Sequence, residues 1–254
     1  MSDELEKLLK FSQLNGYRFQ LLKECVHRGD LVPFVGAGLS RDSGFPLWHD
    51  FVLDMGSKAS VLPQVQSMLK AGDYEGALDA VHTKLGEKLT RTFIRASFGP
   101  RRIDTKQIGG AVRYLPSLAR GPVVTTNYDC ILECVYESAQ ESFDKCVIGA
   151  RVDPVADVVS EAKHFLLKVH GTFDESESQL LSRSDYDKYY GTKSSGKFDP
   201  ALVLPKLMLR IFGSMPLLFL GCSLTDDRTM ALLDYLHRDR EGAAARHFAI
   251  IEET

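Results

Sequence analysis

The sequence predicts an α/β protein with a Rossmann-like parallel sheet and helices on both of its faces. Three observations favour this fold class. Short apolar runs of strand length alternate with segments of helical periodicity. Several of the runs end at a glycine or a polar turn, as strands of an open parallel sheet do. A chain of 254 residues that is 44% hydrophobic can bury a substantial core. The handedness of strand–helix–strand connections then makes a doubly wound topology the simplest one.

Two parts of the chain are expected to be helical outside the alternating pattern. Residues 1–30 should form N-terminal helices, because leucines recur with a helical period, and Gly16 is expected to separate two of them. Residues 57–120 should form a mostly helical insert, whose last helix is ended or kinked by Pro116. No low-complexity linker divides the chain. We therefore expect residues 1–254 to form a single domain.

Five apolar runs have the length of buried strands. They cover residues 31–35, 123–126, 165–169, 216–220 and 247–251. Pro33 places the first run near a sheet edge or at a strand start. Helices are expected between these runs, near residues 128–139, 184–190, 202–213 and 229–236. The polar residues 174–200 are expected to form a surface excursion.

Charge and cysteine usage exclude several classes of protein. A formal net charge of −3 gives no global basic field, so direct nucleic-acid binding is not indicated. Residues 1–10 lack the apolar segment of a signal peptide, and no run reaches the roughly 20 apolar residues of a membrane span. Five irregularly spaced cysteines are typical of reduced thiols. Only Cys130 and Cys134 have metal-ligand spacing, without a second pair. We expect a cytoplasmic protein without a bound metal or a membrane partner.

Four of the predicted strands end in turns that carry glycine or polar residues. These turns are Gly36–Ser40, Asn127–Asp129, His170–Thr172 and Gly221–Leu224. The carboxyl ends of the strands of an open parallel sheet line one crevice, where ligands bind. One shared site explains the four turns better than four unrelated loops do.

Each turn has a functional and a structural interpretation. Gly36 and Gly38 let the backbone approach a ligand, and the amides beside them favour phosphate, although such a turn can simply join a strand to a helix. Asn127 and Asp129 can hold ribose hydroxyls and a carboxamide, or they can cap a helix. His170 is a candidate base or a hydrogen-bonded structural residue.

Two further polar or aromatic residues fall at the predicted turns. Ser223 can bind phosphate at a helix start or cap that helix. Trp48 is interpreted as a packing residue rather than a stacking platform for a ligand.

The order of the four turns resembles that of the sirtuin family. Gly36-Ala-Gly-Leu-Ser40, followed by Gly44-Phe-Pro46, resembles the sirtuin nucleotide-binding turn, and Thr125-Thr-Asn-Tyr-Asp129 resembles the second motif. Val169-His-Gly171 resembles the catalytic His-Gly, and Gly221-Cys-Ser-Leu224 the late Gly-x-Ser turn. The motifs occur in family order over about residues 31–251.

The sequence also departs from the sirtuin deacylases. Residues 172–221 contain no cysteine, whereas the deacylases carry a four-cysteine zinc module there, so no zinc ribbon is expected. Leu47-Trp-His49 stands where the family has an arginine. With its Thr-Thr-Asn-Tyr-Asp motif and helical insert, the chain is more similar to the zinc-free sirtuin-like domains of bacterial antiphage defence proteins, which hydrolyse NAD.

The resemblance implies an NAD hydrolase that cleaves the nicotinamide–ribose bond. NAD is then the substrate, Asn127 orients ribose or water, and His170 accepts a proton. The implied ligand contacts are phosphate at Gly36, Ala37, Gly38 and Ser40, the phosphate–ribose region at Gly221 and Ser223, and the nicotinamide end at Asp129.

Two alternatives to hydrolysis stay open, and control of the enzyme needs an explanation. The alternatives are a non-catalytic module that senses NAD or an ADP-ribose derivative, and a protein deacylase, which the absent zinc module disfavours.

The chain shows no evident sensor segment of its own. The resemblance therefore implies a homo-oligomer or a sensing partner, with residues 4–28 or 63–97 as candidate contact surfaces. The alternative for each of these helices is that its apolar face covers the core.

Overall fold

A parallel β-sheet forms the centre of the computed structural model, which describes residues 3–100, 108–149, 163–191, 198–224, 228–239 and 245–251. Six strands in these residues pair in the order β3-β4-β2-β1-β5-β6, and every pair is parallel. The strands are β1 (Val32–Val35), β2 (Val123–Thr125), β3 (Lys145–Ile148), β4 (Phe165–Lys168), β5 (Leu217–Leu220) and β6 (Phe248–Ala249). The predicted fold class is confirmed.

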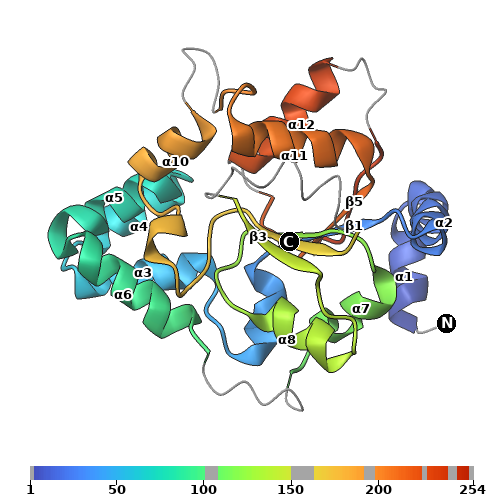
Figure 1. The fold of residues 1–254 in the computed structure, drawn as a ribbon, viewed down its shortest axis with the longest axis horizontal. Coiled ribbons are helices and arrows are strands. Elements are labelled where there is room, and N and C mark those ends of the chain that lie inside the picture. The colour runs from blue at the N-terminus through green and yellow to red at the C-terminus, as the bar shows by residue number, and fades with distance from the viewer. Residues whose placement is uncertain are drawn as a thin grey trace.

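Helices cover both faces of this sheet (Figure 1). One side carries η1 (Ala37–Ser43), α3 (Trp48–Lys58), α4 (Leu62–Lys70), α5 (Tyr74–Leu85), α6 (Glu87–Phe98), η3 (Ala111–Tyr114), α7 (Leu115–Leu118) and α8 (Ile131–Ser138). The other carries α10 (Arg183–Tyr190), α11 (Val203–Ser214) and α12 (Arg228–Asp239). The short η4 (Ser176–Ser178) lies against α6, whose Arg91 donates to the Ser176 and Gln179 carbonyls. In Figure 1, α3 to α6 gather at one end of the sheet, far from the N-terminal helices.

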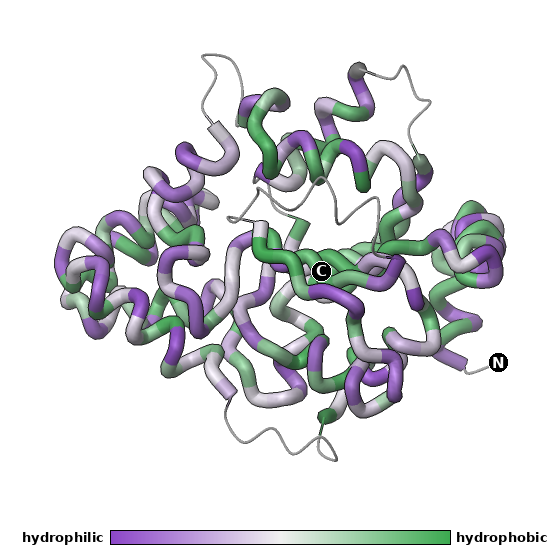
Figure 2. Tube along the Cα trace, viewed as in Figure 1, coloured by the Kyte–Doolittle hydropathy of each residue, from purple (hydrophilic) through white to green (hydrophobic). Residues whose placement is uncertain are grey.

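The strand pleat divides the buried side chains between two apolar cores. Val35 and Leu166 face the core beneath α3 to α8, whereas Phe34 and Leu167 face the core beneath α10 to α12. Figure 2 shows the strands as an apolar centre with more polar helices around it. Because strands in such a sheet are buried on both faces, they read as continuous apolar runs in the sequence.

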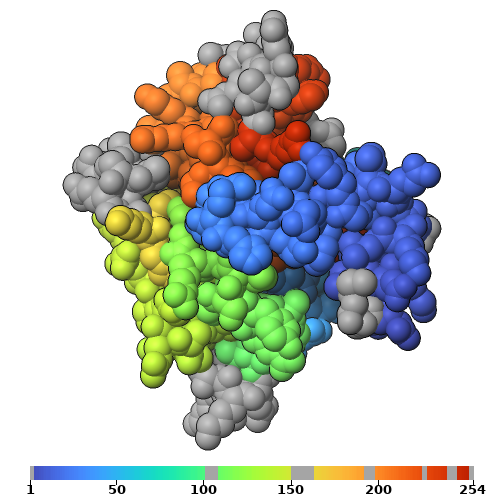
Figure 3. Space-filling view, turned by 90° about the vertical axis from the view of Figure 1, so that its right-hand side faces the viewer, coloured from blue at the N-terminus to red at the C-terminus, as the bar shows by residue number. Residues whose placement is uncertain are grey.

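The N-terminal segment forms two helices, α1 (Asp3–Phe11) and α2 (Gln13–Arg28). The expected break at Gly16 is wrong, since the helices part at Ser12, whose hydroxyl accepts a hydrogen bond from the Leu14 amide at 3.3 Å. Helix α2 packs its Cys25 against Leu31 and Leu218 in a small third core. Figure 3 shows the two helices, in blue, beside the red C-terminal strand segment.

One strand was not predicted, and one of the two positions left open for Pro33 is confirmed. Strand β3 was not predicted, because it lies at the sheet edge and exposes Lys145 and Cys146, so it lacks an apolar run. The strand that contains Pro33 is central rather than at an edge, and Pro33 lies at the start of this strand. The other predicted strands are confirmed within a few residues of their ends.

Candidate active site

The four turns singled out in the sequence lie together at the carboxyl ends of the strands. They follow β4, β2, β1 and β5, which are neighbours in the sheet and all point the same way. The chain runs from β1 to β2 on one side and returns later to place β5 on the other side. The topological switch point therefore lies between β1 and β5, where ligands bind in open α/β sheets.

Glycines let the turns after β1 and β5 touch each other. The Gly38 amide donates to the Gly221 carbonyl at 3.0 Å. A Cβ atom on Gly38 would lie 2.9 Å from the Gly221 Cα, and one on Gly36 would lie 2.5 Å from the Gly221 oxygen. Gly221 itself has a φ of +64°. The contact between the two turns is therefore sufficient reason for glycine at these positions, without any contact to a ligand.

The turn after Gly36 takes the form of a 3-10 helix, η1. Gly36 and Ser40 are buried, whereas Ala37 and Gly38 are partly exposed. Helix α3 begins only at Trp48, whose ring stacks on Phe51 at 5.3 Å. The interpretation of Trp48 as a packing residue is confirmed.

Ser40, Asn127 and Asp129 form one buried polar cluster. The Asn127 side-chain amide donates to the Ser40 Oγ at 3.2 Å, and Ser40 is also hydrogen-bonded to the Asp129 carboxyl. None of the three side chains is more than 7% exposed. Residues from the turns after β1 and β2 therefore act as one unit.

The two polar residues of the second turn have different structural roles. Asp129 accepts a hydrogen bond from the Ile131 amide at 3.0 Å, so the helix-start interpretation holds for this residue. Burial raises the pKa of the Asp129 carboxyl, while the Ile131 amide, the Lys168 ammonium and the Ser40 hydroxyl act to lower it. The Asn127 side chain contacts Ser40 instead of capping α8.

His170 is held between two tyrosines of α10. Its Nε2 lies 3.2 Å from the Tyr190 hydroxyl, and its Nδ1 lies 3.4 Å from the Tyr186 hydroxyl. Both rings meet the imidazole edge to face. Burial, together with the nearby Arg228 cation, lowers the pKa of His170 from 6.5 to about 4. The imidazole is neutral at pH 7, which is the form a general base requires.

Arg228 joins three helices beside His170. Its guanidinium makes two hydrogen bonds of 2.8 Å to the Glu75 carboxylate of α5 and one of 2.6 Å to Asp187 of α10. It also lies over the rings of Tyr186 and Tyr190, 5.4 and 5.9 Å from their centroids. The helical insert, α10 and α12 thereby enclose the tyrosines that contact His170.

The structure divides the predicted residues into two groups and two single residues. Ser40, Asn127 and Asp129 are bonded together, and the glycines of the first and last turns pack on each other. His170 lies in the turn after β4, the strand next to β2, and has its own tyrosine partners. Ser223 lies in the exposed part of the turn after β5.

Sequence reasoning missed the residues that surround His170. Tyr186 and Tyr190 are one helical turn apart in a helix that was predicted, so their shared face was a usable signal. Lys168, a lysine inside an apolar strand, was another. Nothing in the sequence pattern pointed to Arg228.

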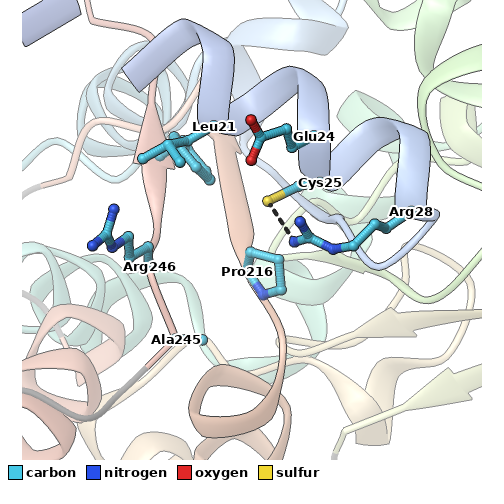
Figure 4. Close-up of a pocket in the computed structure, with 8 residues that line it drawn as sticks. Leu21, Glu24, Cys25, Arg28, Pro216, Ala245 and Arg246 are labelled. Carbon is cyan, nitrogen blue, oxygen red and sulfur yellow. Dashed lines mark hydrogen bonds between the residues drawn. The ribbon is translucent and has the colours of Figure 1, made fainter. Parts of the chain in front are cut away.

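A cavity of about 300 Å³ lies at the amino ends of β5 and β6, away from the four turns (Figure 4). It is bounded by α2 and by residues that precede β5 and β6, among them Cys25, Arg28, Pro216 and Arg246. Arg28 donates to the Cys25 sulfur there at 3.3 Å. This cavity is therefore separate from the four turns.

The described ranges contain neither a candidate metal cluster nor a candidate membrane span. No group of three or more His, Cys, Asp or Glu side chains in these ranges could hold a metal ion. Among the same residues, every helix is too short or too polar to span a lipid bilayer.

The fold and the order of the four turns are those of a sirtuin-like protein, and comparison with known proteins agrees. Residues 122–254 match the model of the family described as SIR2-like domain. This match covers more than half of the chain, so the protein belongs to that family, as the motif resemblance predicted.

Two curated relatives carry informative names. The chain is 25% identical over 219 residues to NAD(+) hydrolase ThsA of Enterococcus faecium, covering 83% of this chain and 40% of that protein. It is 26% identical over 236 residues to Defense-associated sirtuin 2 of Bacillus subtilis, covering 90% of this chain and 21% of that protein. The chain thus spans less than half the length of either relative.

Proposed function

We propose that this chain hydrolyses NAD at the nicotinamide–ribose bond and releases nicotinamide and ADP-ribose. The observation that carries the proposal is a neutral, buried His170 in the turn after β4, beside the strand whose turn holds Asn127. The name of the Enterococcus relative, NAD(+) hydrolase ThsA, supports NAD as the substrate. In this proposal NAD is a substrate, and no metal takes part.

The proposed chemistry uses the two side chains in different ways. Cleavage of a glycosidic bond passes through an oxocarbenium-like sugar, which water then attacks. Asn127 offers an amide that can orient ribose or water, and His170 accepts the proton. Since both ring nitrogens of His170 contact tyrosine hydroxyls, one of these contacts has to give way before the imidazole can take a proton.

The remaining contacts to NAD are assigned by position in the turns. Buried or partly buried backbone amides after β1 and the exposed turn after β5 lie on either side of the switch point. The proposed contacts are phosphate at Gly36, Ala37, Gly38 and Ser40, the phosphate–ribose region at Gly221 and Ser223, and the nicotinamide end at Asp129.

One observation favours a second candidate function, a non-catalytic module that binds NAD. The contacts of both His170 nitrogens with tyrosine hydroxyls leave neither one unengaged for a reacting group. A binding module needs the phosphate turns but no base beside the reactive sugar carbon. The test below separates this function from hydrolysis.

Release of nicotinamide from NAD by the purified chain tests the proposal. We expect His170→Ala and Asn127→Ala each to lower turnover by about 10²-fold or more, because a positioned base contributes about 10²–10⁴-fold. His237→Ala, at an exposed position of α12, is the matched control and should leave turnover unchanged. Thermal unfolding of each variant shows that it is folded.

The outcomes of this experiment separate the functions. Binding of NAD without nicotinamide release would identify a sensor module and contradict hydrolysis. Nicotinamide release that depends on an added acylated peptide would identify a deacylase. Full turnover in both site variants would remove Asn127 and His170 from the mechanism.

We further propose that the hydrolase acts as a toxic effector in bacterial antiphage defence. The proposal rests on the name of the Bacillus relative and on the depletion of NAD that unchecked hydrolysis causes. Expression of the wild-type chain should then lower cellular NAD and stop growth, whereas expression of His170→Ala should do neither. Normal growth with an active, well-expressed wild-type chain would contradict this role.

A further inference from the structure

A buried lysine lies directly beneath the candidate active site. Lys168 is the last residue of β4, two positions before His170, and its side chain is 1% exposed. Taking an ammonium group out of water is costly unless protein groups replace the lost hydration. A lysine retained at such a position therefore needs partners that account for its burial.

The partners of Lys168 match its three N–H donors. The ammonium lies 2.6 Å from the Asp129 carbonyl, 2.9 Å from Glu133 Oε1 and 3.5 Å from the Tyr128 carbonyl. Two of these acceptors belong to the backbone of the turn between β2 and α8. The third, Glu133, is in the first turn of α8 and forms an ion pair with the lysine.

The turn that Lys168 holds is the one that carries Asn127 and Asp129. On the strand side, the Val169 amide donates to the Thr125 carbonyl at 2.8 Å. On the far side, the Phe173 amide donates to the Tyr128 carbonyl at 3.1 Å. Lys168 lies between these two backbone contacts. It therefore joins the turn that carries Asn127 and Asp129 to the end of β4, the strand that leads to His170.

The charge of Lys168 acts on the same turn. Burial raises the pKa of the Asp129 carboxyl, and the Lys168 ammonium opposes that rise, whereas the nearby Glu133 carboxylate adds to it. The lysine thus favours the ionised carboxylate that accepts the Ile131 amide at the start of α8. Geometry and charge act in the same direction.

We propose that Lys168 is a positioning residue that anchors the turn after β2, so that Asn127 and Asp129 keep a fixed place relative to His170. The inference rests on the NAD hydrolysis proposed above. Lys168 does not touch the reacting atoms in this assignment, because its ammonium is enclosed by the turn and by Glu133. Its effect on the reaction is transmitted through the Tyr128 and Asp129 carbonyls.

Three variants distinguish positioning from a general effect on stability. Lys168→Met keeps the length of the side chain and removes its charge and donors. Glu133→Gln keeps an oxygen acceptor for the lysine. The double variant Lys168→Met/Glu133→Gln removes the unpaired carboxylate that the first substitution leaves behind, so it should recover part of the thermal stability that Lys168→Met loses.

The kinetic constants for NAD give the decisive comparison. We expect Lys168→Met to lower kcat by about 10²-fold, the scale expected for a misplacement of about 1 Å. The double variant should stay as slow as Lys168→Met although its unfolding midpoint partly recovers, and Glu133→Gln alone should keep a kcat close to that of wild type. Recovery of both stability and kcat in the double variant would reduce Lys168 to a stabilising residue and overturn the proposal.

Amide hydrogen exchange without ligand tests the anchor independently of catalysis. In both variants that lack Lys168, the Ile131 amide and its neighbours in the turn should exchange faster, while the amides of β5 should not change. Unchanged exchange in the turn would refute the anchor whether or not NAD is the substrate. A wild-type chain that releases no nicotinamide would instead refute the proposed function, and exchange would still decide whether Lys168 holds the turn.

Discussion

The contact between the turns after β1 and β5 predicts opposite effects for one substitution at two glycines. An alanine Cβ at Gly38 would lie 2.9 Å from both the Cα and the carbonyl oxygen of Gly221, which are backbone atoms that cannot rotate away. At Gly16, within α2, an alanine Cβ would have no neighbour within 4 Å among the described residues outside the helix's own backbone, and φ is not left-handed. Gly38→Ala should therefore force the turns apart, whereas Gly16→Ala should favour its helix.

The size of each effect follows from these surroundings. Overpacking against a fixed backbone costs about 1–3 kcal/mol, whereas replacing a helical glycine by alanine gains about 0.5–1 kcal/mol. For a chain of this size, about 1 kcal/mol shifts the unfolding midpoint by about 2–4 °C. We expect Gly38→Ala to lower the midpoint by about 5 °C and Gly16→Ala to raise it by about 2 °C.

Thermal unfolding with and without NAD measures both the stability and the ligand effect. Gly38→Ala should also lose much of the stabilisation that added NAD gives, because the displaced turn is part of the proposed phosphate site. Gly16→Ala should keep the full ligand shift. A Gly38→Ala protein as stable as wild type would show that the two turns do not need their close contact.

Four further outcomes are expected. Arg228→Met should lower the free energy of unfolding in denaturant by about 2 kcal/mol, because it leaves two partly buried carboxylates without their cation, and adding Glu75→Gln should restore part of that loss. With its pKa lowered from 6.5 to about 4, His170 binds a proton in the unfolded state first, so stability should fall as the pH drops through this window, and His170→Gln should make the fall shallower. Elemental analysis should find no stoichiometric zinc, and a chelator should change neither folding nor activity; about one zinc per chain would contradict this. Specific activity should rise with protein concentration or with an added partner, and a strictly monomeric chain with constant activity across a dilution series would contradict an assembly gate.

The sequence predicted the central strands because each is an apolar run closed by glycine, proline or a polar turn. These strands are buried on both faces, so their whole length is apolar and visible in one dimension. Strand β3 was not predicted, because an edge strand pairs with only one neighbour and can expose polar residues. In β3 the exposed residues are Lys145 and Cys146. The break before α2 was misplaced because Gly16 was weighted above the capping hydroxyl of Ser12.

The candidate site was predictable only as far as its turns. Sheet order alone brings turns after neighbouring parallel strands together, so motif positions on strands suffice to locate the edge. The environment of His170 was not predictable, because it comes from α10 and from Arg228 of α12, and no local pattern says which helices fold over a strand end. The function of each glycine was also hidden, since the sequence does not tell whether a close approach is to a ligand or to another turn.

The meeting of Gly36 and Gly38 with Gly221 has a consequence for the order in which the chain acquires activity during synthesis. The first turn leaves the ribosome early, but its partner follows only after most of the domain has been made. At about 5–20 residues per second, the interval is roughly 10–40 s. During this interval the turn after β1 lacks its contact with the turn after β5. Contacts between residues so distant in the sequence are also slow to form. If the chain hydrolyses NAD as proposed, its activity should not appear before β5 has been added to the sheet.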